Sequence, residues 1–259
     1  MSEASFTRGM FCWADLAVPD MDAAARWYAA LFGWSMTPSD PAMPYSMAMQ
    51  AGQMIAGIGP MPPMMVDAGA PPTWTSYVWV DDCAATEAKA VAAGGTVLVP
   101  TMAVADIGAM AIVQDPTGAV IGLWQPGTHA GAELVGQPVS MCWNELMTPD
   151  VGRAKPFYAE VFGWEYAGLP VGDFDYTTIQ VGGRDNGGMM PMEGDDWAGI
   201  PPHWMVYFAV DDTDAIAQAC AASGGQVSVP PTDIPIGRFA VLRDPQGALF
   251  SIIALADAD

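Results

Sequence analysis

Basic residues are scarce in this chain. Lys and Arg together number 8 among 259 residues, against 29 Asp and Glu, so the formal net charge is −21 at pH 7. A surface this negative repels the phosphates of nucleic acids and of anionic membranes. We therefore expect neither a nucleic-acid partner nor a membrane partner.

Long apolar runs are missing as well. No stretch approaches the roughly 18 consecutive apolar residues of a membrane-spanning helix, and the segment Met1-Ser2-Glu3 lacks the basic start of a secretory signal. The sequence predicts a soluble protein of the cytoplasm. Because 52% of the residues are hydrophobic, the chain can form two domains with cores of their own.

Histidine and cysteine are too few for most transition-metal sites. His129 and His203 are the only histidines, and the four cysteines show no Cys-x-x-Cys spacing. Cys12 and Cys142 each precede a tryptophan, and the alternation of a strand would turn these thiols away from the tryptophan face. We expect buried, reduced thiols.

What the sequence does contain is a repeat with an offset of 130 positions. Trp13-Ala14-Asp15-Leu16 recurs as Trp143-Asn144-Glu145-Leu146, and WYAALFGW at 27–34 recurs as FYAEVFGW at 157–164. In the first copy, residues 10–17 have the alternation of a strand, with Trp13 and Asp15 on one face. A helix is expected from Asp20 as N-cap to about residue 32, ended by a glycine. Further short strands follow, one of them with apolar residues at 45, 47 and 49.

A second kind of unit begins at residue 73. It reads as a strand over 73–80, a helix after Asp81-Asp82 that stops at Gly94-Gly95, and three more strands with an Asp-Pro-x-Gly turn at 115–118. The whole pattern recurs after residue 139. The sequence therefore predicts four strand–helix–three-strand units, at about 9–66, 73–126, 139–195 and 203–255. They form a first domain over 1–126, a polar linker over 127–138 and a second domain over 139–259. Other glycine pairs, such as Gly187-Gly188, carry no phosphate-binding fingerprint and are expected at turns.

This arrangement resembles the vicinal oxygen chelate superfamily, which includes glyoxalases, bleomycin-resistance proteins and extradiol dioxygenases. It is also similar to two-domain actinobacterial proteins labelled hydroxylases or glyoxalase-like antigens. The resemblance covers nearly the full chain and rests on motifs present twice: the aromatic helix ending in Phe-Gly-Trp, Val-Asp-Asp, Gly-Gly and Asp-Pro-x-Gly. It implies an α+β fold in which βαβββ units combine into cup-shaped mixed sheets, with the ligand inside the cup. Which units share a cup stays open.

The resemblance also implies where a divalent metal would be bound. The corresponding positions carry poor ligands, namely Trp13, Thr75 and Gly122 in the first domain and Trp143, Met205 and Ser251 in the second. We therefore expect no metal and no cofactor.

The cups offer aromatic and acidic groups instead. Asp15 and Glu145 lie two residues from a tryptophan on the same strand face. They are the candidate catalytic residues, because apolar surroundings raise a carboxyl pKa toward the range useful in acid–base catalysis. The carboxyl groups could equally accept structural hydrogen bonds or contact a ligand. The candidate ligand-binding residues are Trp13, Trp143, Tyr77, Tyr207, Thr75, Met205 and His203. Each tryptophan could also serve as a wall of the core, and His203 could lie at the surface.

Three functions remain open. The first is binding of a small, largely apolar and aromatic molecule in secondary metabolism, as in bleomycin resistance. The second is a metal-free acid–base enzyme of a biosynthetic pathway, such as an isomerase, lyase or cyclase. The third is a metal-dependent glyoxalase or dioxygenase. The sequence does not decide whether the chain is an enzyme. Because the two domains are fused, a monomer is expected.

Overall fold

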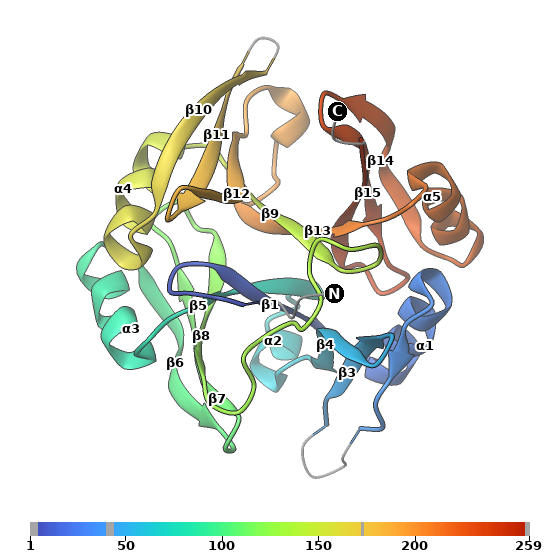
Figure 1. The fold of residues 1–259 in the computed structure, drawn as a ribbon, viewed down its shortest axis with the longest axis horizontal. Helices are drawn as coiled ribbons and strands as arrows, with labels where there is room; N and C mark the ends of the chain where they lie inside the picture. Colours follow the sequence, from blue (N-terminus) through green and yellow to red (C-terminus); the bar gives the residue numbers. More distant parts are fainter. Residues whose placement is uncertain (1–4, 40–43, 172–173, 257–259) are drawn as a thin grey trace.

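The computed structural model describes residues 5–39, 44–171 and 174–256 (Figure 1). These residues form two eight-stranded sheets with the same strand order, β2-β3-β4-β1-β5-β8-β7-β6 and β10-β11-β12-β9-β13-β16-β15-β14. Each sheet mixes parallel and antiparallel pairs. The predicted α+β fold with two tandem domains is confirmed.

The elements of the first domain follow the predicted order. They are β1 (Phe11–Val18), α1 (Met21–Phe32), β2 (Ser35–Met36), β3 (Ser46–Gln50), β4 (Gln53–Pro60), α2 (Pro63–Asp67), β5 (Thr73–Trp79), α3 (Cys83–Ala92), β6 (Thr96–Val104), β7 (Gly108–Gln114) and β8 (Val120–Pro126). The short helix α2 was not predicted, since the Pro- and Met-rich sequence around it has no helical period.

The second domain repeats this order. Its elements are β9 (Met141–Thr148), α4 (Val151–Phe162), β10 (Glu165–Val171), β11 (Phe174–Val181), β12 (Arg184–Pro191), the 3₁₀ turn η1 (Asp195–Trp197), β13 (His203–Ala209), α5 (Thr213–Ala222), β14 (Gln226–Ile234), β15 (Gly237–Arg243) and β16 (Leu249–Leu255). Among the residues that the structure describes, no helix has both the length and the apolar character needed to cross a membrane.

Pairing between the first strands of two units joins them into one open sheet in each domain. β1 runs antiparallel to β5 with Asp15 opposite Thr75, and β9 runs antiparallel to β13 with Glu145 opposite Met205. The units therefore combine within each half of the chain, which the sequence left open. In Figure 1 the first sheet opens downward and the second upward, and their backs meet where β5 contacts β13. We call the concave face of the first sheet cup 1 and that of the second sheet cup 2.

Helix ends follow the predicted capping chemistry. The side chain of Asp20 accepts a hydrogen bond from the backbone N–H of Ala23, which satisfies a donor in the first turn of α1. The same contact begins the other three long helices, at Asp82, Asp150 and Asp212. Gly33 has φ 72°, a left-handed conformation that glycine adopts without steric cost and that ends α1.

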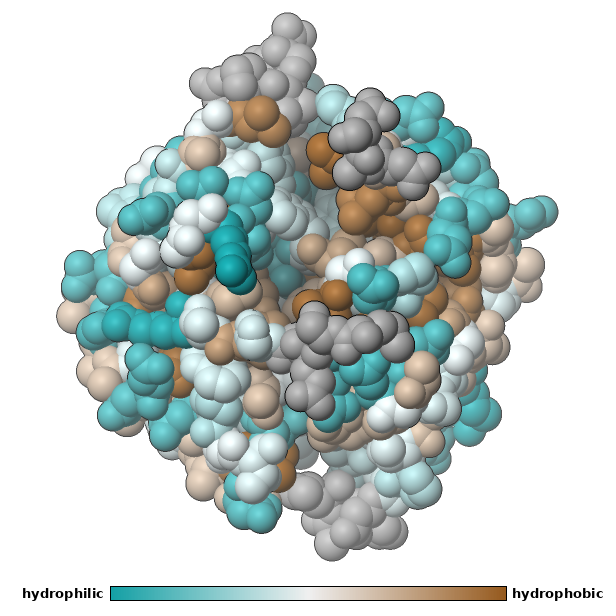
Figure 2. Space-filling model, viewed as in Figure 1, coloured by the Kyte–Doolittle hydropathy of each residue, from teal (hydrophilic) through white to brown (hydrophobic). Residues whose placement is uncertain are grey.

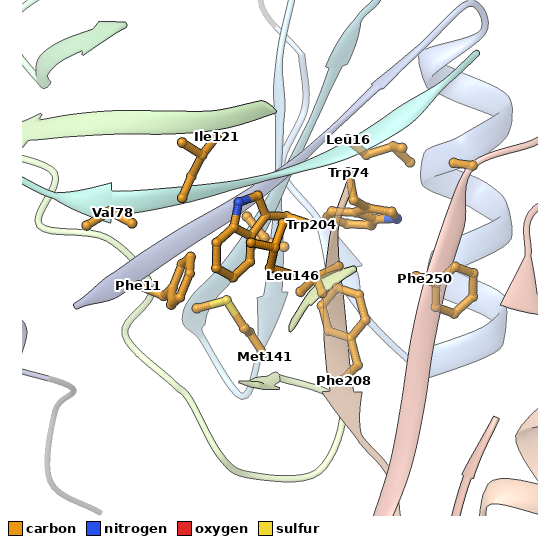
Figure 3. Packing of buried hydrophobic residues seen from close by; sticks show 14 of the residues in the cluster. Phe11, Leu16, Trp74, Val78, Ile121, Met141, Leu146, Trp204, Phe208 and Phe250 are labelled. Atoms are coloured by element: carbon orange, nitrogen blue, oxygen red, sulfur yellow. The ribbon is translucent and has the colours of Figure 1, made fainter. Parts of the chain in front are cut away.

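One hydrophobic core runs through both domains. It joins the backs of the two sheets, so that Phe11 of the first domain packs against Trp204 of the second with ring centroids 5.1 Å apart. Trp74 and Phe208 form a second such contact at 5.1 Å. Figure 3 shows these side chains lying between the strands of the two halves. The two domains therefore exclude water from a shared surface.

The repeated aromatic helix connects one domain to the other. The hydroxyl of Tyr28 on α1 donates to the carboxylate of Asp244, 3.2 Å away in the Asp-Pro-x-Gly turn of the second domain, and accepts from the indole of Trp74 at 3.0 Å. All three side chains are buried. The second copy repeats both contacts: Tyr158 on α4 donates to Asp115 of the first domain at 2.9 Å and accepts from Trp204 of its own domain at 2.8 Å.

The cysteine prediction needs a correction. The register of β1 against β5 shifts between Phe11 and Trp13, which makes Cys12 the extra residue of a β-bulge. Its side chain consequently packs with Trp13 on the cup side instead of turning away from it. The same shift in β9 brings Cys142 beside Trp143. The four thiols are free, as predicted, and Cys142 is half-buried instead of fully buried.

Candidate functional site

The floor of cup 1 holds a carboxyl group between two phenols. Asp15 on β1 accepts hydrogen bonds from the hydroxyls of Tyr45 and Tyr77, both at 3.3 Å, and the indole of Trp13 donates to Tyr45 at 3.0 Å. Burial raises the pKa of Asp15 to about 7, although the two tyrosine hydrogen bonds oppose the rise. Burial also raises the pKa values of Tyr45 and Tyr77, so both phenols stay protonated donors.

Cup 2 repeats this arrangement with a longer acid. Glu145 on β9 accepts a hydrogen bond from the hydroxyl of Tyr207 at 2.7 Å, and the indole of Trp143 donates to Tyr176 at 2.9 Å. Burial raises the pKa of Glu145, while hydrogen bonding from Tyr176 and Tyr207 lowers it. Each cup therefore contains the same set of one indole, one carboxyl group and two phenols.

Tyr45 and Tyr176 were not among the predicted site residues. Their rings lie directly over glycines of the neighbouring strand: a Cβ added to Gly57 would lie 1.7 Å from the Tyr45 hydroxyl, and one added to Gly188 would lie 1.8 Å from the Tyr176 hydroxyl. Gly188 thus lies inside β12 and not in a turn, which corrects the sequence prediction. A tyrosine near a glycine-containing strand in both repeats was the signal available in the sequence.

The remaining predicted residues lie on the cup faces of β5 and β13. Thr75 is half-buried opposite Asp15, and Met205 is buried opposite Glu145. His203 begins β13 on the same face as Met205, and its Nδ1 lies 2.8 Å from the carbonyl oxygen of Pro201. Burial lowers the pKa of His203. This histidine pairs with Met147 of β9, and Met147 lies two residues from Glu145 on the same strand.

The two cups are covered at different ends. In cup 1, Trp13 and Cys12 are almost completely inaccessible, at 4% and 0% exposure, whereas Trp143 and Cys142 in cup 2 are only half-buried. The carboxyl groups show the opposite difference, since Glu145 in cup 2 is buried and Asp15 in cup 1 is half-buried. Figure 2 shows a hollow on the visible face between β10–β12 and β14–β15 of the second domain.

The segment predicted as a polar linker covers the tryptophan end of cup 1. His129 is buried there, with its ring centroid 4.6 Å from that of Trp13 and 5.6 Å from that of Trp124. Neither ring nitrogen has a hydrogen-bond partner among the described residues. A buried polar group without a partner costs about 1–3 kcal/mol. This contact could not be predicted from composition, because a linker and an inward-facing loop have similar composition.

Comparison with known proteins identifies the family. The model of the Glyoxalase/Bleomycin resistance protein/Dioxygenase superfamily matches residues 135–252, and that of a glyoxalase-like domain matches residues 13–123. A Mycobacterium tuberculosis protein named "Putative glyoxylase CFP32" is 43% identical, with 96% of each chain covered. The chain belongs to this superfamily. The family resemblance inferred from the repeated motifs is thereby confirmed.

Other known proteins are similar over most of the chain. The "Anthracycline biosynthesis protein DnrV" of Streptomyces peucetius is 35% identical over 97% of this chain and 95% of its own. Among solved structures, the Mn(II)-bound glyoxalase from Novosphingobium aromaticivorans has a TM-score of 0.66 and 18% identity, covering 100% of this chain and 85% of its own. The 2,3-dioxygenase LapB from Pseudomonas sp. KL28 has a TM-score of 0.63 and 15% identity, covering 97% and 93%. These two similarities concern the fold.

The divalent metal of some superfamily members does not fit the side chains of these cups. In cup 1 the ring of Tyr77 covers Gly122 so closely that a Cβ there would lie 2.2 Å from the ring, which leaves no room for a longer ligand. In cup 2 the corresponding residue is Ser251, a weak ligand beside Tyr207. No three His, Cys, Asp or Glu side chains converge anywhere in the described ranges. We therefore derive no chemistry through a metal.

Ser251 carries the other buried side-chain atom without a geometric hydrogen bond in the described part of the chain. Its hydroxyl is fully inaccessible, and no described residue hydrogen-bonds to it. It lies on β16 next to Tyr207 of β13, between Leu249 and Ile253, whose side chains pack in cup 2. Cup 2 therefore has an enclosed serine hydroxyl beside Tyr207, in addition to the carboxyl group of Glu145.

Proposed function

We propose that this superfamily member binds a flat, largely apolar small molecule with aromatic rings in cup 2. The observation that carries the proposal is the half-buried indole of Trp143, which lies beside the buried carboxyl group of Glu145. A partly accessible indole at the floor of a concave sheet can stack against another ring, which is worth about 0.5–1.5 kcal/mol beyond the buried area. The rest of the lining is apolar and adaptable, with Met147, Met190 and Met205.

The polar groups of cup 2 suit oxygen substituents on such a ligand. Because burial raises the pKa of Glu145, its carboxyl group is more often protonated than a surface glutamate and can donate a hydrogen bond. A ligand with a carbonyl or hydroxyl group on fused rings would pair with this carboxyl group. Such rings are characteristic of anthracyclines, the compounds for whose biosynthesis the DnrV protein is named.

Acid–base catalysis in the same cup is the second candidate. A buried carboxyl group with a raised pKa is suited to exchange protons with a bound molecule, and Tyr207 lies 2.7 Å from it to relay or hold a proton. The reaction class would be tautomerisation of an aromatic ketone, in which a proton leaves carbon and returns to carbon or oxygen. Glu145 would take the proton, and no metal would be involved.

The binding proposal predicts a specific loss with Trp143→Ala. We expect 1,4-dihydroxyanthraquinone, a planar fused-ring probe, to quench the tryptophan fluorescence of the native protein with saturation. Trp143→Ala should weaken its affinity about tenfold or more, because the stacking surface is removed. Trp27→Ala is the matched control, because Trp27 is also half-buried but lies on α1 outside the cups, and it should leave the affinity within about twofold. Absence of saturable binding to the native protein, or equal effects of the two variants, would contradict the proposal.

Glu145→Gln separates binding from catalysis. The amide keeps the shape of the side chain and removes the titratable proton, so probe binding should change little. If the cup catalyses proton transfer, the native protein should accelerate deuterium exchange at the CH₂ group of anthrone in D₂O. Glu145→Gln should then reduce that acceleration by about 10²–10⁴-fold. If the native protein does not accelerate the exchange, this reaction is eliminated and the binding function remains.

A further inference from the structure

Residues 127–135, here called the plug, enter cup 1 directly after β8. His129, Gly131 and Ala132 face inward, while the residues at 127, 128 and 130 are exposed. Ala132 belongs to the apolar cluster that includes Trp13 and Tyr77, and His129 lies against Trp13. The plug thus covers Trp13 in cup 1, whereas the equivalent residue in cup 2, Trp143, is only half-buried.

Backbone hydrogen bonds hold the plug in place. The N–H of Ala132 donates to the carbonyl oxygen of Cys12 at 2.8 Å, an acceptor on the bulged residue of β1. The N–H of Glu133 donates to the carbonyl oxygen of Met54 at 2.7 Å, and its carboxylate accepts from the N–H of Met54 at 2.7 Å. The plug therefore binds to β1 and β4 by specific contacts and does not merely pass over the cup.

One side chain of the plug opposes this closure. The imidazole of His129 is more than nine-tenths buried, and both of its nitrogens lack a partner in the described structure. Those nitrogens lose hydration when the plug closes and gain no hydrogen bond in return. An apolar ring at this position would close the cup more firmly. The residue present is thus poorly suited to a permanent seal between Trp13 and Trp124.

We propose that cup 1 is a second, gated binding site for the class of planar aromatic ligand proposed for cup 2, and that the plug must leave before the ligand enters. The proposal rests on the proposed function, because it assigns the same ligand class to the second copy of the indole, carboxyl and phenol set. In the open state, the indoles of Trp13 and Trp124 lose the imidazole and become available for ring stacking. Asp15 is already half-exposed at the other end of this cup.

Gly131 allows a selective disruption of the plug. It has φ +119°, and a Cβ there would lie 2.5 Å from the carbonyl oxygen of Cys12, so Gly131→Val should unseat the plug. Gly136→Ala is the matched control, since Gly136 also has a positive φ of +67° but no atom within 4 Å of an added Cβ. His129→Phe should act in the opposite direction, because it keeps a flat ring and removes the unpaired nitrogens.

The first measurement is hydrogen exchange of the plug in the full chain, followed by mass spectrometry. We expect Gly131→Val to accelerate exchange of the Ala132 and Glu133 amides by at least about tenfold, and His129→Phe to slow it by about tenfold. Gly136→Ala should leave it within about threefold. Unchanged exchange in both Gly131→Val and His129→Phe, with the folded circular dichroism spectrum retained, would overturn the gate.

The second measurement counts bound molecules of 1,4-dihydroxyanthraquinone. Binding to cup 1 should be about tenfold tighter in Gly131→Val than in the native chain, because opening no longer costs free energy. Combining Gly131→Val with Trp143→Ala isolates cup 1, and Trp13→Ala should then abolish the remaining binding. An open plug without a second bound molecule would overturn the second site. Failure of the native protein to bind in cup 2 would instead overturn the proposed function, and the exchange result would still test the gate.

Discussion

At the scale of single residues, each cup contains one acidic side chain whose pKa is raised by folding, so that its charged form is disfavoured. Asp15 lies among Tyr45, Tyr77 and Trp13, and only the phenols offer it hydrogen bonds. No described lysine, arginine or histidine forms an ion pair with it, since the described ion pairs involve only Arg238. Desolvation therefore outweighs hydrogen bonding, and the carboxyl group retains its proton to a higher pH than in the unfolded chain.

Asp15→Asn tests this account through the pH dependence of stability. The pKa of Asp15 rises from 3.8 to about 7 on folding, so the unfolded chain loses this proton near pH 4 while the native protein keeps it to about pH 7. The native protein should therefore lose stability as the pH rises from 4 to 7, by up to about 4 kcal/mol from this group. Asp15→Asn lacks that loss. Its stability relative to the native sequence should increase over the same range and stay constant above pH 8.

Urea unfolding at pH 4, 5, 6, 7 and 8 provides the measurement. Asp196→Asn is the control, because Asp196 is exposed in η1 and its replacement leaves the cups unchanged. A stability difference between Asp15→Asn and the native protein that is flat from pH 4 to pH 8 would show that Asp15 is not desolvated as described.

At the scale of elements, the aromatic helices α1 and α4 are cross-domain contacts. Each presents a buried tyrosine whose hydroxyl joins an indole of its own domain to an Asp-Pro-x-Gly turn of the other. The motif that carries the family resemblance therefore does not line either cup. It fixes the two sheets back to back, which in turn holds both cups open in opposite directions.

Tyr158→Phe should destabilise the whole protein. The substitution keeps the ring and leaves the buried carboxylate of Asp115 and the indole of Trp204 each without one partner. We expect a loss of about 1–3 kcal/mol in the free energy of unfolding. Tyr166→Phe is the control, because its hydroxyl donates to the carbonyl oxygen of Lys155 within the same domain and is only partly buried. Equal losses for the two variants in urea titrations would contradict a special role for the cross-domain contact.

At the scale of the whole molecule, the shared core makes the two domains one cooperative structure. The same apolar cluster includes Leu16 and Trp74 of the first domain and Leu146 and Phe208 of the second, and all are buried (Figure 3). Separating the domains would expose these side chains to water. The free energy of that exposure couples the unfolding of one half to that of the other.

Calorimetry should therefore show one unfolding transition for the complete chain. We expect the ratio of calorimetric to van't Hoff enthalpy to be about 1. Leu16→Ala, at a fully buried position of β1, should lower the single transition as a whole, with a loss of about 2–5 kcal/mol. Two resolved transitions, of which Leu16→Ala lowers only the first, would show that the domains unfold independently.

Local chemistry within the sequence determined the elements and their order. The Asp N-caps at 20, 82, 150 and 212, and the strand alternation that turns Trp13 and Asp15 to one face, act between near neighbours in the chain. Such signals can be read without a structure because the interacting groups lie within a few residues of one another.

Tertiary structure alone decided what surrounds the acids. Tyr45 and Tyr77 reach Asp15 from 30 and 62 residues away, and the bulge that turns Cys12 into the cup exists only in the register of β1 against β5. The entry of His129 into cup 1 likewise depends on the concave shape of the first sheet, which the sequence does not specify locally. Burial, and with it the raised pKa of each carboxyl group, results from packing among residues distant in the chain, so it appears only when the sheets have formed.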